Sequence, residues 1–357
     1  MQPKSDELEI ESSQQKPSKI AKIEKEDQCD NLDLETMKPQ NPNFQRYLIA
    51  IEYIGTRFSG SQQQPRFRTV VGVLEEAFRK FVGQPVSIFC SSRTDAGVHA
   101  LSNVCHVDVE RISKRKPGEV LPPHEPGVVI RAVNHFLQKD EGDITVIDVR
   151  CIPSDFHARY KARERTYFYR LLCGPEPLSI FEKDRAWHVP DEGLNIIAMQ
   201  KACKILVGTH DFSSFRATGC QAKSPIRTLD ELNVSEVVST PYFPSCIERE
   251  QSIISRQEPL VCSISSETEQ SIKVDRVDCR QEFGQRRIHR CFVITTRSRS
   301  FLYHQVRFLV GALKAVGTGD LTPDDVERIL NAKTVSAASP MAPACGLYLG
   351  NVKFEFP

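Results

Sequence analysis

The feature that most constrains the fold is an order of apolar segments that occurs twice along the chain. In the first half, strand-like and helix-like runs follow one another as β-α-β-β-α-β. Strands are predicted at 47–53, 86–92, 104–109 and 144–149, and helices at 70–82 and 128–137. The helix at 70–82 is the clearest of these elements, because its apolar residues recur on one helical face.

The second half repeats this order. Strands are predicted at 166–172, 226–238, 289–296 and 347–354, and helices at 195–207, 301–316 and 323–330. The β-α-β-β-α-β order is that of a ferredoxin-like unit. The sequence therefore predicts an α+β protein of two ferredoxin-like units, with mixed, mainly antiparallel sheets and helices on one side. The sheets would either face each other or join edge to edge, with a central cleft for a large substrate.

Composition divides the chain further. Residues 1–44 hold six Lys against ten acidic residues and few aromatics, so we expect a disordered acidic tail. Residues 45–160 form the predicted N-terminal unit and residues 161–357 the C-terminal unit. Within the latter, the Ser-, Glu- and Gln-rich segment 239–287 is predicted to be a partly disordered insert, either a tolerated surface insertion or a docking segment. Because the whole chain carries only +1, the remainder is net positive, which allows a phosphate-rich partner.

Several classes of protein are disfavoured by motifs that the sequence lacks. Its twelve Cys include no CxxC pair, so we expect reduced thiols and no structural zinc. There is no apolar run of about 18 residues for a membrane span. The first residues resemble neither a secretory signal nor an Arg-rich presequence. No GxGxxG, P-loop or HExxH motif indicates a nucleotide cofactor or a metal. We expect an intracellular protein without cofactor.

The segment Cys90–Ala100 is the strongest candidate for chemistry, because it places an acid, a base and an imidazole in a short polar turn. If the preceding strand persists to Arg93, the side chains of Arg93 and Asp95 share a face. At about 4 Å and an effective dielectric of about 20, their attraction is about 4 kcal/mol and favours an ionised carboxylate. Such a carboxylate can act as a nucleophile or a base. The same spacing also suits a turn acid held by a structural Arg.

Other basic and aromatic residues suggest binding of RNA or an ordinary core. Arg165, Tyr167 and Tyr169 share one strand face, which suits base stacking beside phosphate neutralisation, or a half-buried strand with Tyr in the core. Arg159 lies in a basic loop between the two halves. Arg307 lies on an otherwise apolar helix and needs an anionic partner, which would be a structural acid, Asp95 or a phosphate.

The segment Arg93–His99 resembles the signature of the TruA-type tRNA pseudouridine synthases. Further blocks are similar to those of the family, in the same order, at 155–159, 165–169, 210–215, 300–307 and 346–349. The resemblance covers about residues 45–355 apart from the insert. The residues around 100–103 and 341–344 resemble the eukaryotic pseudouridylate synthase-like subgroup most.

This resemblance implies an isomerase that converts uridine to pseudouridine in RNA without metal or cofactor. The implied substrate is tRNA, with mRNA as an alternative. Asp95 matches the catalytic Asp, Arg93 its ion-pair partner, and Tyr167 the Tyr that stacks on uracil and takes part in proton transfer. The expected substrate-binding residues are Arg307, Leu347, Arg159 and Arg165. Family members include monomers and homodimers, and both mitochondria and the cytoplasm or nucleus remain open as compartments.

The chain departs from the family pattern at Ser61. The family usually has Gly-Trp-Gln where this chain has Gly60-Ser61-Gln62, so RNA contacts in this loop are not carried over. Two other function classes remain. One is a non-catalytic RNA-binding protein on the same scaffold, which would tolerate Asp95→Asn. The other is a hydrolase that uses Asp95 with His99, which requires a metal or a His at hydrogen-bond distance.

Overall fold

The structure is a computed structural model that describes residues 44–116, 118–139, 141–190, 193–237 and 289–356. The predicted insert 239–287 and all of the predicted tail except its last residue lie outside the described residues. That last residue, Phe44, begins the first strand instead. In the described ranges, no helix combines the length and the apolar character that crossing a membrane requires.

The N-terminal unit has the predicted β-α-β-β-α-β order. Its elements are β1 (Phe44–Tyr53), α2 (Val70–Val82), β2 (Ile88–Cys90), β3 (His99–Glu110), α3 (Pro126–Lys139) and β4 (Ile144–Ile152). Capping residues set the ends of α2. The Thr69 side chain accepts a hydrogen bond from the Gly72 N–H at 3.2 Å, and Gly83 ends the helix in a left-handed conformation. The predicted helix is therefore confirmed at both ends.

The C-terminal unit contains the predicted elements and two short strands besides. Its elements are β5 (Ala162–Cys173), β6 (Trp187–Val189), α4 (Ile196–Leu206), β7 (Gly208–Asp211), β8 (Ile226–Val237), β9 (Arg290–Ser298), α6 (Gln305–Gly317), α7 (Pro323–Ala332) and β10 (Leu347–Phe354). The sequence did not predict β6 and β7, because three or four residues are too few to show alternation. The predicted helix start at Phe301 was wrong, because His304 takes a left-handed φ of 62° and α6 begins after it.

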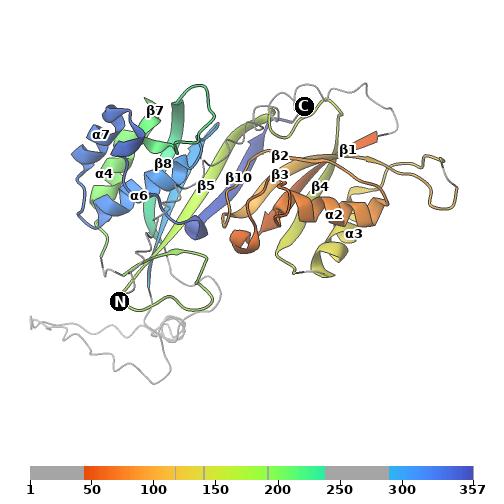
Figure 1. Ribbon diagram of the computed structural model, residues 1–357, viewed down its shortest axis with the longest axis horizontal. Helices are drawn as coiled ribbons and strands as arrows, with labels where there is room; N and C mark the ends of the chain where they lie inside the picture. Colours follow the sequence, from red (N-terminus) through yellow and green to blue (C-terminus); the bar gives the residue numbers. More distant parts are fainter. Residues whose placement is uncertain (1–43, 117, 140, 191–192, 238–288, 357) are drawn as a thin grey trace, which may run out of the picture. The chain divides into compact units, whose positions relative to one another are not determined.

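The ten strands of the described residues belong to one sheet, whose main path runs β4-β1-β3-β10-β5-β9-β8-β7 (Figure 1). In addition, β2 pairs with β3 and β6 pairs with β5. The N-terminal unit thus has the order β4-β1-β3-β2. In the C-terminal unit, β10-β5-β9-β8 repeats this order, with β5, β8, β9 and β10 as its first to fourth strands. The two predicted ferredoxin-like units are therefore confirmed, and they join edge to edge.

The junction between the units lies on one edge of β3. One edge of β3 pairs with β1 along its length. Both β2 and β10 therefore pair with the opposite edge of β3. β2 pairs with it near Cys105 and ends at Cys90, whereas β10 pairs with it in parallel at His99 and Ala100. The segment 91–98 therefore leaves the sheet where β10 replaces β2. The predicted strand to Ser92 was too long, so strand alternation cannot relate Arg93 to Asp95.

Helices and a linker cover the sheet. α2 and α3 lie together beside the N-terminal half, and α4, α6 and α7 group beside the C-terminal half (Figure 1). Successive residues Cys105 and His106 of β3 are both buried, so both faces of this strand are covered. Beside His106, the linker after β4 contributes Ala158, whose N–H donates to His106 Nδ1 at 3.3 Å. The linker thus reaches the sheet close to the junction.

Candidate active site

Asp95 lies in the loop that connects β2 to β3, at the junction between the two units. The neighbouring residue Thr94 is held from two directions. Its N–H donates to Ser61 Oγ at 2.8 Å, and its carbonyl accepts from the Ser61 N–H at 2.9 Å. On its other side, Thr94 Oγ1 lies 2.8 Å from the Tyr53 hydroxyl. The Asp95 carbonyl then accepts from the Val98 N–H at 3.2 Å, which closes a tight turn that begins at Asp95.

Gly60 shows how closely this loop is packed. Its φ is 102°, a conformation that L side chains rarely adopt, and an added Cβ would lie 3.0 Å from the Thr94 carbonyl oxygen. The backbone of this segment can therefore approach the Asp95 loop only with glycine here. Asn103 of β3 also holds this loop, because its side-chain amide donates to the Ser92 carbonyl at 3.1 Å.

Arg165 of β5 connects this loop to three other parts of the chain. Its guanidinium donates to the Ser91 carbonyl at 2.8 Å and to Ser92 Oγ at 3.2 Å. It also donates to the backbone carbonyls of Arg159 and Arg299. Burial among these neutral acceptors lowers its pKa. Since its donors bind protein atoms, the geometry suits a residue that positions the Asp95 loop.

Two side chains from the start of α6 approach the Asp95 carboxylate. His304 Nε2 lies 3.3 Å from Asp95 Oδ2, and Arg307 Nη1 lies 3.9 Å from the same oxygen. Burial raises the pKa of Asp95, whereas the charges of His304 and Arg307 oppose that increase. The N-terminal end of α6 carries a partial positive charge, which also favours a carboxylate there. The arrangement holds one partly exposed carboxylate among groups that stabilise its ionised form.

His304 is in an unusual backbone conformation. A φ of 62° is uncommon for a residue other than glycine and costs on the order of 1 kcal/mol or more. Its ring stacks on Tyr303 at 3.8 Å between centroids. Burial lowers the pKa of His304, although the Asp95 charge opposes this. The strained turn before α6 therefore directs an imidazole at the carboxylate.

Tyr167 is buried in β5 and coupled electrostatically to Asp95. Burial raises its pKa to about 12, the Arg165 charge opposes this, and the Asp95 charge adds to it. Phe301 packs edge-on against its ring with a centroid separation of 5.2 Å. The phenol is thus protonated at neutral pH and available as a hydrogen-bond donor. Tyr169, two residues further on, is fully buried and donates to the Pro343 carbonyl, which suits a core role.

The remaining predicted residues contact three different parts of the chain. Nε of Arg93 donates to the Gln62 side-chain oxygen at 2.9 Å when the amide oxygen faces the guanidinium. The Arg159 guanidinium lies 6.0 Å from the ring centroid of Tyr160 in the linker. Leu347 is buried at the start of β10, opposite Tyr169 of β5.

The segment before Leu347 is attached to both α6 and the Asp95 loop. Arg307 Nε donates to the Ala342 carbonyl at 2.7 Å, and the Ala342 N–H donates to the Arg307 carbonyl at 3.1 Å. A Cβ added at Gly97 would lie 3.3 Å from the Ala344 side chain. These contacts bring the start of β10 to the same region as Asp95.

The imidazole of His99 is surrounded by backbone groups that occupy both of its ring nitrogens. Its Nδ1 accepts from the Gly55 N–H at 3.0 Å, and its Nε2 lies 3.1 Å from the carbonyls of Asp184 and Cys345. Burial lowers its pKa. Since both ring nitrogens bind backbone groups, this geometry does not favour a hydrolase in which His99 assists Asp95. Within the described part of the chain, no group of three or more His, Cys, Asp or Glu could hold a metal ion.

The sequence did not single out His304, although it lies in the block 300–307. The available signal was its position three residues before Arg307, next to a helix start. Apolar Phe301 and Leu302 extended the helical pattern in the prediction and concealed the fact that His304 precedes the helix.

Comparison with known proteins identifies the family of this chain. A family model described as tRNA pseudouridine synthase matches residues 49–161 and 202–355. The chain belongs to this family. Relatives include a tRNA pseudouridine synthase A of Rhodospirillum centenum, 38% identical over 304 residues, which are 85% of this chain and 97% of the relative. The human tRNA pseudouridine synthase-like 1 is 37% identical over 318 residues, covering 87% of this chain and 90% of the relative. The tRNA pseudouridine synthase A of Roseobacter denitrificans is 34% identical over 312 residues, which are 87% of this chain and 96% of the relative.

Membership of the tRNA pseudouridine synthase family gives the departure at Ser61 a structural meaning. Ser61 is 1% exposed and binds the backbone of Thr94 on both sides. A buried side chain at this position cannot contact RNA. In this member of the family, residue 61 therefore supports the Asp95 loop.

Proposed function

We propose that this protein isomerises uridine to pseudouridine in tRNA, with Asp95 as the catalytic carboxylate. One observation carries the proposal. The Asp95 carboxylate is held at the N-terminal end of α6 beside His304 and Arg307, in a loop bound on several sides. The names of the bacterial and human relatives support tRNA rather than mRNA as the substrate.

The reaction rearranges the target nucleoside without adding or removing atoms overall. The bond between N1 of uracil and C1′ of ribose breaks, the uracil turns, and C5 bonds to C1′. The proton on C5 leaves, and N1 gains a proton. An ionised Asp95 serves this chemistry either as a nucleophile or as a base at C2′. Both routes need the carboxylate that His304 and Arg307 stabilise.

The other side chains act around this carboxylate. Tyr167, protonated and buried beside Phe301, offers a ring for the uracil to stack on and a hydroxyl for proton transfer. Leu347 supplies an apolar wall. Arg93 remains the proposed ion-pair partner of Asp95, as the family resemblance implies, and Arg159 is proposed to contact the RNA backbone. We assign Arg165 to positioning the Asp95 loop rather than to binding phosphate, because its donors already bind carbonyl and hydroxyl oxygens.

The proposed division at residues 160 and 161 distributes these roles between the units. The N-terminal unit contributes Asp95 and Arg93, and the C-terminal unit contributes Tyr167, His304 and Arg307. The target base must leave its stack to reach Asp95, which costs a few kcal/mol. Phosphate contacts of basic residues from both units would offset this cost.

The experiment measures tritium release from a tRNA transcript that contains uridine labelled at C5. Asp95→Ala is expected to lower the rate by roughly 10³-fold or more, because no other group replaces the carboxylate. Filter binding should show tRNA affinity within about threefold of the parent, since phosphate contacts dominate affinity. Asp148→Ala, which removes an exposed acid on β4, is the matched control and should leave the rate unchanged.

Two results would contradict the proposal. Tritium release by the Asp95→Ala protein at the parent rate would exclude Asp95 as the catalytic group. If the parent protein binds tRNA and mRNA transcripts but releases no tritium from either, the protein is a non-catalytic RNA-binding member of the family.

A further inference from the structure

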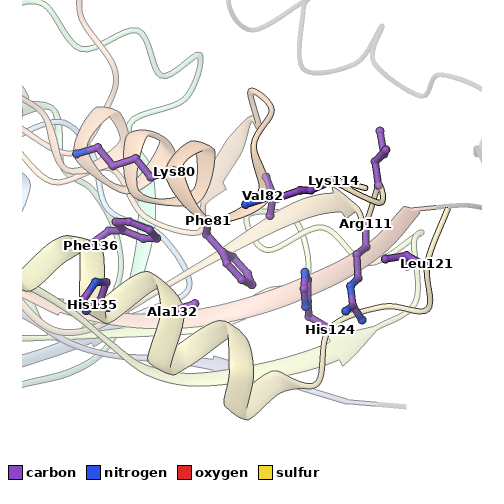
Figure 2. Close-up of a pocket in the computed structure, with 11 residues that line it drawn as sticks. Lys80, Phe81, Val82, Arg111, Lys114, Leu121, His124, Ala132, His135 and Phe136 are labelled. Carbon is purple, nitrogen blue, oxygen red and sulfur yellow. The ribbon is translucent and has the colours of Figure 1, made fainter. Parts of the chain in front are cut away.

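A pocket that the reaction does not use lies between α2, α3 and the loop that follows β3 (Figure 2). It is a half-open depression with a volume of about 480 Å³, within the range of about 300–1,000 Å³ that is typical of sites for small organic groups. None of its lining residues belongs to the site around Asp95. The loop is part of the basic, Pro-rich segment 111–126, to which the proposed reaction assigns no role.

The charges in this pocket favour an anion. Lys80, Arg111 and Lys114 line it, and no Asp or Glu is among its lining residues. Burial lowers the pKa of His124, and the charges of Arg111 and Lys114 lower it further. A neutral imidazole beside two cations indicates a positive potential inside the pocket. On α2, Glu76 forms ion pairs with Arg79 and, at 3.9 Å, with Lys80, so the Lys80 charge is partly balanced.

Rings and apolar side chains form the rest of the wall. Phe81 and His124 both line the pocket and pack against each other in a tilted arrangement, with ring centroids 4.7 Å apart (Figure 2). Phe136 of α3 lines the pocket with His135, and the two rings lie 5.4 Å apart. Flat rings next to cations can stack a base and neutralise the attached phosphate, as in sites for single-stranded nucleic acid. The ligand chemistry that fits is therefore an aromatic ring joined to a phosphate.

The Arg111 side chain is held in place before any ligand binds. It donates from Nη1 to the Pro122 carbonyl at 3.0 Å, and its carbonyl accepts from the Leu121 N–H at 2.8 Å. The Tyr47 hydroxyl donates to the His124 carbonyl at 2.6 Å, which fixes the other side of the loop to β1. Arg111 and His124 are thus held in place by the rest of the fold, which lowers the entropy cost of binding a ligand.

We propose that this pocket binds an unpaired nucleotide of the RNA substrate, at a position other than the target uridine. The base would pack against Phe81 and Phe136, and its phosphate would lie near Arg111 and Lys114. The proposal rests on the proposed RNA substrate but not on the chemistry of Asp95. Such a contact would hold the RNA on the N-terminal unit while the target base enters the site.

The test compares two double variants of the full-length protein. Lys80→Gln with Lys114→Gln removes two charges at the pocket. Lys201→Gln with Lys204→Gln removes two exposed charges of α4 and is the matched control. The pocket variant should raise the Kd for the tRNA transcript about tenfold. Its slope of log affinity against log salt should be smaller by about 0.7, because the proposed nucleotide brings one phosphate to the pocket and each phosphate contact to a single strand contributes about 0.7. The control variant should keep the parent Kd and slope.

Ultraviolet crosslinking provides the second measurement. Nucleotides crosslinked to the peptides that carry Phe81, His124 or Phe136 are expected for the parent protein and should be lost in a His124→Ala variant. The proposal is overturned if the pocket variant and the control variant bind tRNA equally well. It is also overturned if uridine monophosphate binds the parent but not the pocket variant while both bind tRNA equally, because the ligand is then a free nucleotide. These readouts measure binding, so they remain informative even if tritium release fails.

Discussion

At the scale of single residues, burial and charge act on Asp95 in opposite directions. Burial raises the pKa of its carboxyl, and the nearby His304 and Arg307 limit the increase. A carboxyl with a raised pKa loses its charge at a higher pH than an exposed Asp does. The proposed reaction needs the ionised form, so its rate should fall with acidification at a pH above the ordinary range of Asp. The charges of His304 and Arg307 determine how far above that range the pKa of Asp95 lies.

His304→Asn tests this balance. Asn tolerates the left-handed backbone of residue 304 but cannot carry a positive charge. Because the His304 charge lowers the pKa of Asp95, its removal should raise that pKa. The acid limb of the single-turnover rate should therefore move to higher pH.

His210→Asn replaces an imidazole of β7 that binds the Val207 carbonyl, and it should leave the pH profile unchanged. An acid limb of the His304→Asn protein that stays in place or moves to lower pH would show that His304 does not stabilise the carboxylate.

At the scale of elements, one loop is positioned by strands that are far apart in sequence. Tyr53 of β1, Asn103 of β3 and Arg165 of β5 each bind the segment 91–94. A loop bound in this way keeps Asp95 in place without the target RNA. Errors of about 1 Å in the position of a catalytic group can cost about 10²-fold in rate, which gives such positioning a direct effect on catalysis.

Arg165→Met separates positioning from substrate binding. Met keeps most of the side-chain volume but removes the donors to Ser91 and Ser92. We expect kcat to fall by about 10²-fold while KM for tRNA changes less than about threefold. Amide hydrogen exchange in the segment 91–98 should become faster.

The neighbouring cation provides the control for that variant. Arg163 lies on the same strand, more than half exposed, and pairs with Glu355. Arg163→Met should leave kcat and hydrogen exchange unchanged. If Arg165→Met instead raises KM and leaves kcat and exchange at parent values, Arg165 binds substrate, as the sequence suggested.

At the scale of the whole described fold, β10 is the strand on which the two units depend. It comes last in the C-terminal unit, yet it pairs with both β5 and β3 (Figure 1). Leu349 lies opposite Tyr167 on one side and Ala100 on the other, and it is fully buried. A substitution that removes the Leu349 side chain should therefore destabilise both units.

Leu349→Ala should lower the free energy of unfolding by about 2–5 kcal/mol, the cost of a large-to-small change in a core. Urea unfolding should remain one transition, with the same midpoint by circular dichroism and by fluorescence of Trp187 in β6. Ile180→Ala, at a residue that is 79% exposed, should leave the midpoint unchanged. Two separate transitions, of which only the fluorescence transition moves, would show that the units unfold independently.

Residue types and local periodicity were enough to predict most elements. The ends of α2 follow from Thr69 and Gly83, and short runs of apolar, β-branched and aromatic residues indicate the strands β1, β5 and β9. The same local patterns failed where a tertiary contact decides the conformation. β2 is shorter than its apolar run because the loop that carries Asp95 leaves the sheet at Cys90.

The sequence by itself determined the two ferredoxin-like units and, through the resemblance of the segment 93–99, predicted Asp95 as the catalytic residue. Which groups surround that carboxylate was decided only by tertiary structure. His304 reaches Asp95 because a left-handed residue turns the chain before α6, and Arg165 holds the loop because β10 brings the two units into one sheet. Contacts between residues so distant in sequence depend on strand order and on single backbone angles. Periodicity along a chain carries neither kind of information, because it reports only which face of an element is apolar.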